Sequence, residues 1–281
     1  MLSLVLGTTA LAAPPAPTEY AATARWMVSD MTWGYMSTIS TRTNASTPGD
    51  AFGNPYSFAD ASNGVPYFYV SDLDASIVDM FSGPGAKPRA SLALSEATLR
   101  MVNGSAQIAA CEIGTPLGDP ENPPCARLVL SGTMVKLAAD SAEGKTAHDA
   151  LFARHPSFKH YPKDHAFYCT KLEVDSVWLI DAYGGAAIVS PSDYFAASIP
   201  PAVAAPTPAA APLAVAKELV EEAKEVVAAP KVGAAPWIWE HPKYARWMAS
   251  MLNWGVLSTV STRSKVRPLP LPAVSSHASR A

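Results

Sequence analysis

Apolar residues alternate with polar ones along much of the chain, in runs that predict strands interrupted by a few helices. The alternation is clearest in VPYFYV, RASLALS and ARLVLSGTMVKL. Long strands with few intervening helices are typical of a closed antiparallel barrel, so the predicted class is α+β, mainly β. The expected helices cover about 18–29, 72–81 and 141–154, and the expected strands cover 33–41, 65–70, 89–95, 126–137 and 166–183.

Two local features sharpen this prediction. Asp72 is expected to cap the helix that begins there, with Leu73 packed in the core. The residues between 42 and 64 are polar and contain several Gly, Pro and Asn, so a loop is expected there.

One 19-residue segment occurs twice in the chain. Residues 24–42, ARWMVSDMTWGYMSTISTR, recur as residues 245–263, ARWMASMLNWGVLSTVSTR, with 12 of 19 residues identical. A repeat spaced by 221 positions indicates tandem domains and not a solenoid. We therefore expect one complete domain over 18–196 and only the start of a second over 237–263.

The segments around these domains have the composition of linkers. Seven prolines lie between Pro200 and Pro236, which predicts an extended spacer over 197–236. Within it, LAVAKELVEEAKEVV is expected to form a short amphipathic helix, and 264–281 is expected to be a disordered tail. The second copy is interpreted as a truncated or misread tandem domain, or as a helix and strand that add to the barrel of another copy.

Charge and hydropathy exclude two classes of function. The chain has 21 basic and 24 acidic residues, a net charge of −3, and no cluster of Lys and Arg. A nucleic-acid partner is therefore not expected. Every apolar run of 18 residues is broken by a proline or a charge, so no transmembrane helix is expected.

The first 17 residues are expected to be a signal peptide with a short tail. MLSLVLGTTALAA combines an apolar run with small residues at Ala10 and Ala12. A disordered alanine-rich tail is the alternative, because no Lys or Arg precedes the apolar run. Two N-glycosylation sequons, at Asn44 and Asn103, favour the secretory pathway.

Cys111 and Cys125 bracket a Gly- and Pro-rich loop that a disulfide would close. In the chain-entropy model this closure stabilises the fold by about 3 kcal/mol, and an oxidising compartment would maintain it. Two free thiols are the alternative, and the spacing does not match a zinc or thioredoxin-type site. Cys169 is expected to be a buried strand thiol.

Four motifs follow one another in order between residues 24 and 195. They are ARWMVSDMTWGYMSTIST, GVPYFYVSDL, the cysteine-bounded loop leading into LVLSGTMVKL, and LFARHPSFKHYPKDHAFYCTKLEVDSVWLIDAYGGAAIVSPSDYF. Together they resemble the CREG family. The resemblance implies a split β-barrel of the FMN-binding-like type, like that of pyridoxamine 5'-phosphate oxidases, with a few flanking helices. It also implies a secreted or lysosomal glycoprotein, a homodimer through the barrel and a disulfide between Cys111 and Cys125. Ala186 departs from the family pattern, which usually has proline there.

The relatives of this fold raise the question of a flavin site. A flavin phosphate needs positive charge or several aimed donors, and flavin-binding relatives carry basic residues after the strand that corresponds to VPYFYV. Here VSDLDASIVDMF follows, with three aspartates and no Lys or Arg, so it is expected to repel a phosphate. No cofactor is expected, and FMN is the alternative. If flavin binds, the residues left to hold it are Ser40, Thr41, Arg42, Arg89 and Ser91, which otherwise serve as strand-end salt bridges and hydrogen bonds.

The histidines and aromatic residues do not predict a catalytic site. The spacing of His148, His155, His160 and His165 does not match a metal site, and His155 is expected to bond the backbone at a helix end. No Ser-His-Asp order or nucleophile elbow is present, so neither metal ligands nor catalytic residues are expected. The core or a dimer interface is the expected place of Trp33, Tyr67, Tyr69, Trp178 and Tyr183.

These observations favour a non-enzymatic glycoprotein of the secretory pathway, extracellular or in a lysosome or vacuole. Its expected mode of action is protein binding, with a homodimer and a protein receptor as partners. The alternative is an FMN-dependent oxidoreductase of the pyridoxamine 5'-phosphate oxidase-like class.

Overall fold

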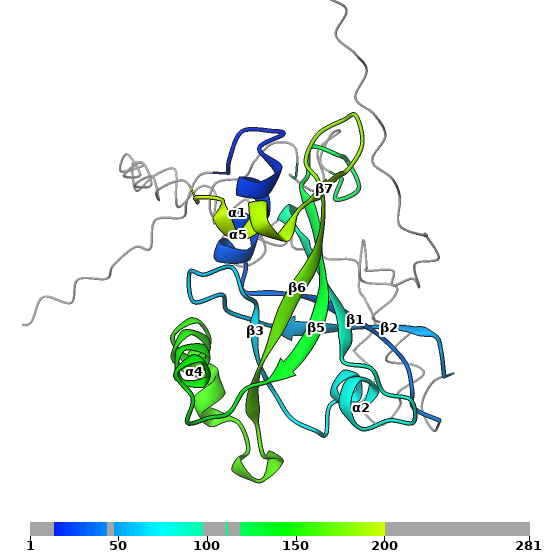
Figure 1. The fold of residues 1–281 in the computed structure, drawn as a ribbon, viewed down its shortest axis with the longest axis vertical. Helices are drawn as coiled ribbons and strands as arrows, with labels where there is room; N and C mark the ends of the chain where they lie inside the picture. The colour runs from blue at the N-terminus through cyan, green and yellow to red at the C-terminus, as the bar shows by residue number, and fades with distance from the viewer. Residues whose placement is uncertain (1–13, 44–47, 98–110, 112–118, 200–281) are drawn as a thin grey trace, which may run out of the picture.

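The computed structural model describes residues 14–43, 48–97, 111 and 119–199. Their elements form an antiparallel sheet surrounded by helices (Figure 1). Within this part of the chain, no helix is long and apolar enough to cross a membrane. Several predictions concern residues outside the described ranges. They are the signal peptide at the apolar start of the chain, glycosylation at Asn44 and Asn103, the linker with its helix, the partial domain at 237–263 and the tail.

The described strands are ordered β2-β1-β4-β5-β6-β3, and β7 pairs with β6. The ends of this order meet, because Ala59, just after β2, forms a bridge with Tyr67 at the start of β3. Nearby, the ring of Tyr56 lies 6.1 Å from that of Phe68. The sheet therefore curls into a barrel, as predicted. The bounds are β1 Trp33–Ile39, β2 Ala51–Ser57, β3 Tyr67–Val70, β4 Arg89–Ser95, β5 Arg127–Lys136, β6 Tyr168–Ile180 and β7 Ala187–Val189.

Alternate residues of each strand fill the barrel interior. On β5 every second residue from Leu128 to Met134 is buried, and on the neighbouring β4 Leu92 is fully buried. Burying each large apolar side chain contributes about 1.5–3 kcal/mol. Gly132 marks a bulge where β5 pairs with β6. A Cβ at that position would lie 2.1 Å from the carbonyl oxygen of Glu173, so the strands can approach only because the residue is glycine.

Helices pack around the barrel (Figure 1). α1 buries Ala24, Trp26 and Met27, and it contacts α5 and β6. α4 contacts β3 and β6, whereas α2 contacts β1. Ser141 caps α4 by accepting a hydrogen bond from the Gly144 N–H at 3.0 Å. The bounds are α1 Tyr20–Asp30, α2 Ala75–Phe81, α4 Ala142–Arg154 and α5 Pro191–Ala196, with 3₁₀ helices η2 Pro156–His160 and η3 Lys163–His165.

The loop prediction between 42 and 64 is wrong in part, because Ala51–Ser57 form β2. Pro55, one of the residues that suggested a loop, is exposed, and among the described strands β2 pairs with β1 alone. An edge strand tolerates proline, because one of its sides needs no ladder hydrogen bonds. The short elements β7 and α5 also have no counterpart in the prediction.

The predicted start of α2 is wrong as well. The helix begins at Ala75, and Asp74 caps it by accepting hydrogen bonds from the N–H groups of Ser76 (2.8 Å) and Ile77 (3.3 Å). Leu73 does not reach the core and is 72% exposed. A carboxylate two residues further along the chain therefore replaces Asp72 as the cap.

Candidate functional site

Three of the candidate phosphate ligands, Ser40, Thr41 and Arg42, follow β1 directly. Asp79 of α2 directs its carboxylate at this segment. Its Oδ1 accepts hydrogen bonds from the Thr41 N–H (2.8 Å), the Thr41 hydroxyl (3.3 Å) and Arg42 Nε (3.0 Å). Its Oδ2 accepts a hydrogen bond from the Thr38 hydroxyl at 3.4 Å. The Asp79 side chain is fully buried and that of Arg42 is 12% exposed, so a carboxylate of the chain itself occupies the anion-binding donors.

The other two candidates, Arg89 and Ser91, lie on β4 and have different partners. Arg89 forms a two-pronged ion pair with Asp175 of β6, with 3.1 Å between Nη2 and Oδ1. Hydrogen bonding to Asp175 raises the pKa of Arg89. The Ser91 hydroxyl forms a hydrogen bond of 2.7 Å with that of Ser131 on β5. Ser91 therefore links the neighbouring strands β4 and β5, whereas Arg89 reaches across β5 to β6, and neither residue joins the cluster around Asp79.

The other aspartates near α2 also have partners within the protein. Asp72 accepts hydrogen bonds from the Tyr168 hydroxyl and from Lys136 Nζ, and both bonds lower its pKa. Asp74 accepts hydrogen bonds from Asn54 and Tyr56 of β2 in addition to capping α2. These residues do not fit the phosphate of a flavin, because α2 presents the carboxylate of Asp79 and the donors opposite the helix already bind it.

His155 and His148, two of the four clustered histidines, make separate contacts. The Nε2 of His155 lies 2.9 Å from the carbonyl oxygen of Phe58, which confirms the expected bond to the backbone at the end of α4. Burial lowers the pKa of His155. His148 stacks on Phe152, with 4.1 Å between ring centroids, and lies 3.4 Å from Asp149.

Cys111 and Cys125 form the expected disulfide, and both are fully buried. Beside it, the Glu96 carboxylate accepts a hydrogen bond from the Ala126 N–H at 3.0 Å and lies 3.4 Å from the Cys111 sulfur. Within the described part of the chain, these two cysteines and Glu96 are the side chains close enough together to hold a metal, but the disulfide removes both thiolates. Cys169 is a buried thiol in β6, as predicted, and burial raises its pKa to about 11.

Arg154, the last residue of α4, holds the end of α1. Its guanidinium donates hydrogen bonds to the carbonyl oxygens of Val28 (3.4 Å), Ser29 (2.6 Å) and Met31 (2.9 Å). It also lies 3.5 Å from the buried carboxylate of Asp60. A cation is favourable at a helix C-terminus, where the last carbonyl groups lack helical partners. The sequence gives no signal for this link, because the partner carbonyls lie 123 to 126 positions away.

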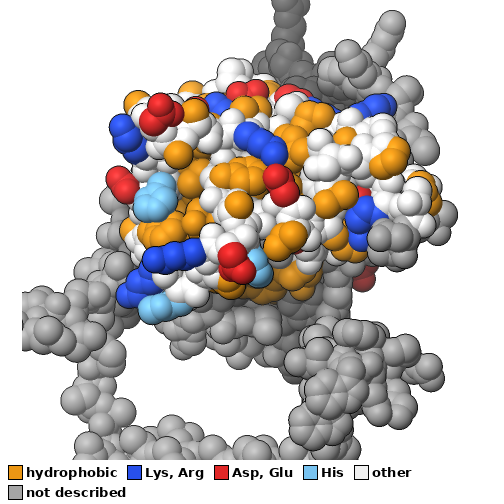
Figure 2. Space-filling model, turned by 90° about the horizontal axis from the view of Figure 1, so that it is seen from below, with side chains coloured by type: hydrophobic (Ala, Val, Ile, Leu, Met, Phe, Trp, Pro, Cys, Tyr) orange, Lys and Arg blue, Asp and Glu red, His pale blue; other side chains and the backbone are white. Residues whose placement is uncertain are grey.

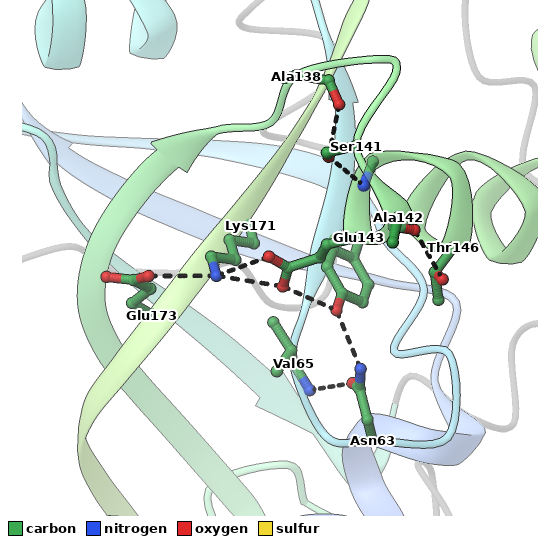
Figure 3. A network of polar contacts seen from close by, with 11 residues as sticks. Asn63, Val65, Ala138, Ser141, Ala142, Glu143, Thr146, Lys171 and Glu173 are labelled. Carbon is green, nitrogen blue, oxygen red and sulfur yellow. Dashed lines mark hydrogen bonds and ion pairs between the residues drawn. The ribbon is translucent and has the colours of Figure 1, made fainter.

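A second network, shown in Figure 3, attaches the first turn of α4 to the barrel. Glu143 accepts hydrogen bonds from Lys171 Nζ on β6 (3.0 and 3.1 Å) and from the Tyr67 hydroxyl on β3 (3.3 Å). Lys171 also pairs with Glu173 at 3.2 Å, and the Tyr67 hydroxyl accepts a hydrogen bond from Asn63 at 2.9 Å. Tyr67 is 1% exposed, which confirms its prediction as a core residue.

The outer face of the sheet carries what we call the outer apolar row. The row crosses five strands, from β1 through β4, β5 and β6 to β7, and its side chains alternate with those of the core. Ile188, at one end, is 73% exposed. A parallel row of serines lies beside it. The outer apolar row consists of Tyr35, Ala93, Val129, Trp178 and Ile188, and the serine row of Ser37, Ser91, Ser131 and Ser176.

The end of the molecule that carries α4 and α2 has a mixed surface. Figure 2 shows this end, with hydrophobic side chains gathered in the middle and side chains of both charges scattered among them. Tyr69 of β3 lies in an aromatic cluster with Phe152 of α4, Phe158 of η2 and Phe167, which precedes β6. The ring centroid of Tyr69 lies 5.1 Å from those of Phe152 and Phe167 and 5.6 Å from that of Phe158. On the described part of this face, charges of one sign do not gather into a patch.

Comparisons with known proteins agree with the resemblance. The curated relatives include Protein CREG1 of Gallus gallus, 32% identical over 64% of this chain and 88% of that protein. Protein CREG2 of Homo sapiens is 32% identical over 66% of this chain, but the match spans only 59% of that protein. Among solved structures, the heme binding protein from Mycobacterium smegmatis aligns with a TM-score of 0.48 and 21% identity, over 66% of this chain and 63% of that one.

The family assignment rests on a family model that covers the whole described domain. The family model described as "CREG, beta-barrel" matches residues 15–196, which include all the strands and helices described above. The mainly antiparallel α+β architecture agrees with the split β-barrel that the motifs imply. The chain belongs to the CREG family.

Proposed function

We propose that this chain is a non-enzymatic CREG-type glycoprotein of the secretory pathway, extracellular or lysosomal, that acts by binding other proteins. Its flavin site is degenerate. The observation that carries this proposal is the buried carboxylate of Asp79, bound by Thr41 and Arg42 where a phosphate would need its donors.

Electrostatics explains why Asp79 excludes a phosphate. Two unit charges 4 Å apart repel by about 4 kcal/mol at an effective dielectric constant near 20, and a phosphate dianion repels about twice as strongly. If Asp79 moved aside instead, its fully buried carboxylate would lose the hydrogen bonds from Thr41 and Arg42 that offset the cost of its burial. Both routes oppose binding, so weak or no affinity for FMN is expected.

The outer apolar row supports a protein partner, and a second copy of the chain is the first partner we propose. The row places Trp178 and Ile188 next to each other across β6 and β7, with Tyr35 at the far end. The adjacent serines are small, which allows a second flat surface to approach closely. Ile188 is exposed and the other four residues of the row are partly exposed. Accessible apolar stripes with a polar border are typical of protein interfaces.

The disulfide supports a place in the secretory pathway. Disulfides persist in oxidising compartments and are rare in the cytosol. The apolar start of the chain and the sequons at Asn44 and Asn103 support the same location from the sequence.

An FMN titration of the full chain, purified from a secretory host, tests the proposal. Flavin absorption and the quenching of flavin fluorescence report binding. We expect a colourless protein without saturable binding. A yellow protein, or stoichiometric binding of FMN, would overturn the proposal in favour of the flavin-dependent oxidoreductase.

Two variants test whether Asp79 is the cause. Asp79→Asn removes the negative charge and keeps the side-chain shape, so it should bind FMN more tightly than the unmodified chain does. Asp72→Asn is the matched control, because Asp72 is exposed and pairs with Lys136, and it should leave the titration unchanged. Equal behaviour of the two variants would contradict the role given to Asp79.

A further inference from the structure

The α1–β1 segment is held in the barrel by contacts that demand particular residues. At Gly34 a Cβ would lie 2.9 Å from the backbone oxygen of Ala93 and 2.3 Å from the Leu94 side chain, so β1 can lie this close to β4 only with glycine. Arg25 is 5% exposed and donates a hydrogen bond to the carbonyl oxygen of Ser62 at 3.3 Å.

The end of the same segment carries the donors for Asp79. Thr38, Thr41 and Arg42 all bond to that carboxylate, as described above. An unrelated strand placed at this position would leave Asp79 buried without its partners, which is strongly unfavourable. Only a segment that carries these donors can therefore take the place of β1, between β2 and β4, without leaving Asp79 unpaired.

The repeat at 245–263 retains each of these residues. Gly255 corresponds to Gly34, and Arg246 corresponds to Arg25. The Asp79 donors recur as well, and so do three buried residues of α1. The donors recur as Thr259, Thr262 and Arg263, and Ala24, Trp26 and Met27 recur as Ala245, Trp247 and Met248.

The differences between the two copies are compatible with the same place in the barrel. At the buried positions that change, one apolar residue replaces another: Leu252 for Met31 and Leu257 for Met36, with a loss of volume only at Ala249, which replaces Val28. Swaps of similar volume are well tolerated in cores. Met251 replaces Asp30, a carboxyl that burial already disfavours in its charged form.

We propose that residues 245–263 are a second version of the α1–β1 segment, able to replace residues 24–42 in the barrel of the same chain. Both versions carry the side chains that β4, α2 and the loop after β2 require. The barrel can then be completed by either one, and the segment that is not used is released from the domain.

The connection is long enough for this exchange within one chain. There are 45 residues between position 199, where the described structure ends, and the start of the repeat. Even a flexible chain of that length spans about 35–40 Å on average, and a proline-rich one spans more, whereas a domain of this size has a radius of gyration of about 16 Å. Attachment to the same chain also gives the repeat a high effective concentration near the barrel.

Valine substitutions at the paired glycines test the proposal in the full chain. Gly34→Val forces the first copy against β4, so folding should depend on the second copy. We expect Gly34→Val to keep a cooperative thermal transition and native near-ultraviolet circular dichroism, and Gly34→Val with Gly255→Val to lose both. Gly255→Val alone is the control and should behave like the unmodified chain. If Gly34→Val and the double variant behave alike, whether folded or unfolded, the proposal is overturned.

Cross-linking locates the repeat directly. Tyr35 lies opposite Ala93 in the β1–β4 register, so Val256, its counterpart in the repeat, would lie there after exchange. We expect Ala93→Cys with Val256→Cys to form a disulfide within one chain, in a yield that rises in the Gly34→Val background. Ala93→Cys with Leu257→Cys is the control and should not link, because Leu257 would face the barrel interior. No link at Val256, an equal yield at Leu257, or links only between chains would overturn the proposal.

Discussion

Replacing Asp79 by alanine should destabilise the barrel more than most single substitutions. The variant leaves Arg42 with 12% of its side chain exposed and no counter-ion, and it removes the acceptor of the Thr41 N–H. Breaking a buried ion pair by removing one partner costs about 3–5 kcal/mol. For a domain of this size each kcal/mol lowers the melting temperature by about 2–4 °C. A decrease of about 6–20 °C is therefore expected.

Urea unfolding followed by tryptophan fluorescence measures the loss of free energy, and two further variants separate its causes. Asp175→Ala breaks the half-exposed pair with Arg89 and should cost less than about 1 kcal/mol, because water screens exposed pairs. Arg42→Met combined with Asp79→Ala leaves no buried charge unpaired, so it should be more stable than Asp79→Ala alone. A loss below about 1 kcal/mol for Asp79→Ala, or simple additivity in the double variant, would refute the reasoning.

Three other perturbations probe separate parts of the molecule. Burial raises the pKa of Asp30 to about 6, so the folded state binds this proton more tightly than the unfolded state and stability should rise as pH falls from 7 towards 4. Asp30→Asn should stabilise the protein by about 1 kcal/mol at pH 7, after allowance for solvent screening, and this gain should vanish near pH 4 in parallel urea titrations. Trp178→Glu, on the outer apolar row, should shift sedimentation from the proposed dimer to a monomer, whereas Ser176→Glu should do so less; a dimer that persists in both variants would place the interface elsewhere. Replacing Cys111 and Cys125 together by alanine should lower the free energy of unfolding by about 3 kcal/mol, and a loss near zero would show that the disulfide adds no constraint.

Alternation of apolar residues predicts strands well where one face is tightly buried. RASLALS coincides with β4, Arg89–Ser95, because each second residue must enter the barrel. The same signal fails for β2, where Gly53 and Pro55 suggest a loop. An edge strand has fewer backbone and packing constraints, so its composition carries less information about its conformation.

The candidate site could be predicted only in part, because charge can be counted from the sequence but not placed. The absence of Lys and Arg from residues 70–81 directs attention to α2. The sequence cannot show that Asp79 contacts Thr41, 38 positions earlier, and that its carboxylate is the anion bound by the donors after β1. The link from Arg154 to the end of α1 is equally hidden, because it depends on how α4 packs after the barrel closes.

The buried thiol of Cys169 should make the reversibility of unfolding depend on pH. In the folded barrel its pKa is about 11, so at neutral pH almost none of it is the thiolate that attacks disulfides. Unfolding returns the thiol to water, where a pKa near 8.5 leaves about 3% as thiolate at pH 7. Exchange with the Cys111–Cys125 disulfide can then trap chains in wrong pairings. At pH 5 the thiolate fraction falls about a hundredfold, so the protein should survive repeated heating in acid far better than at neutral pH.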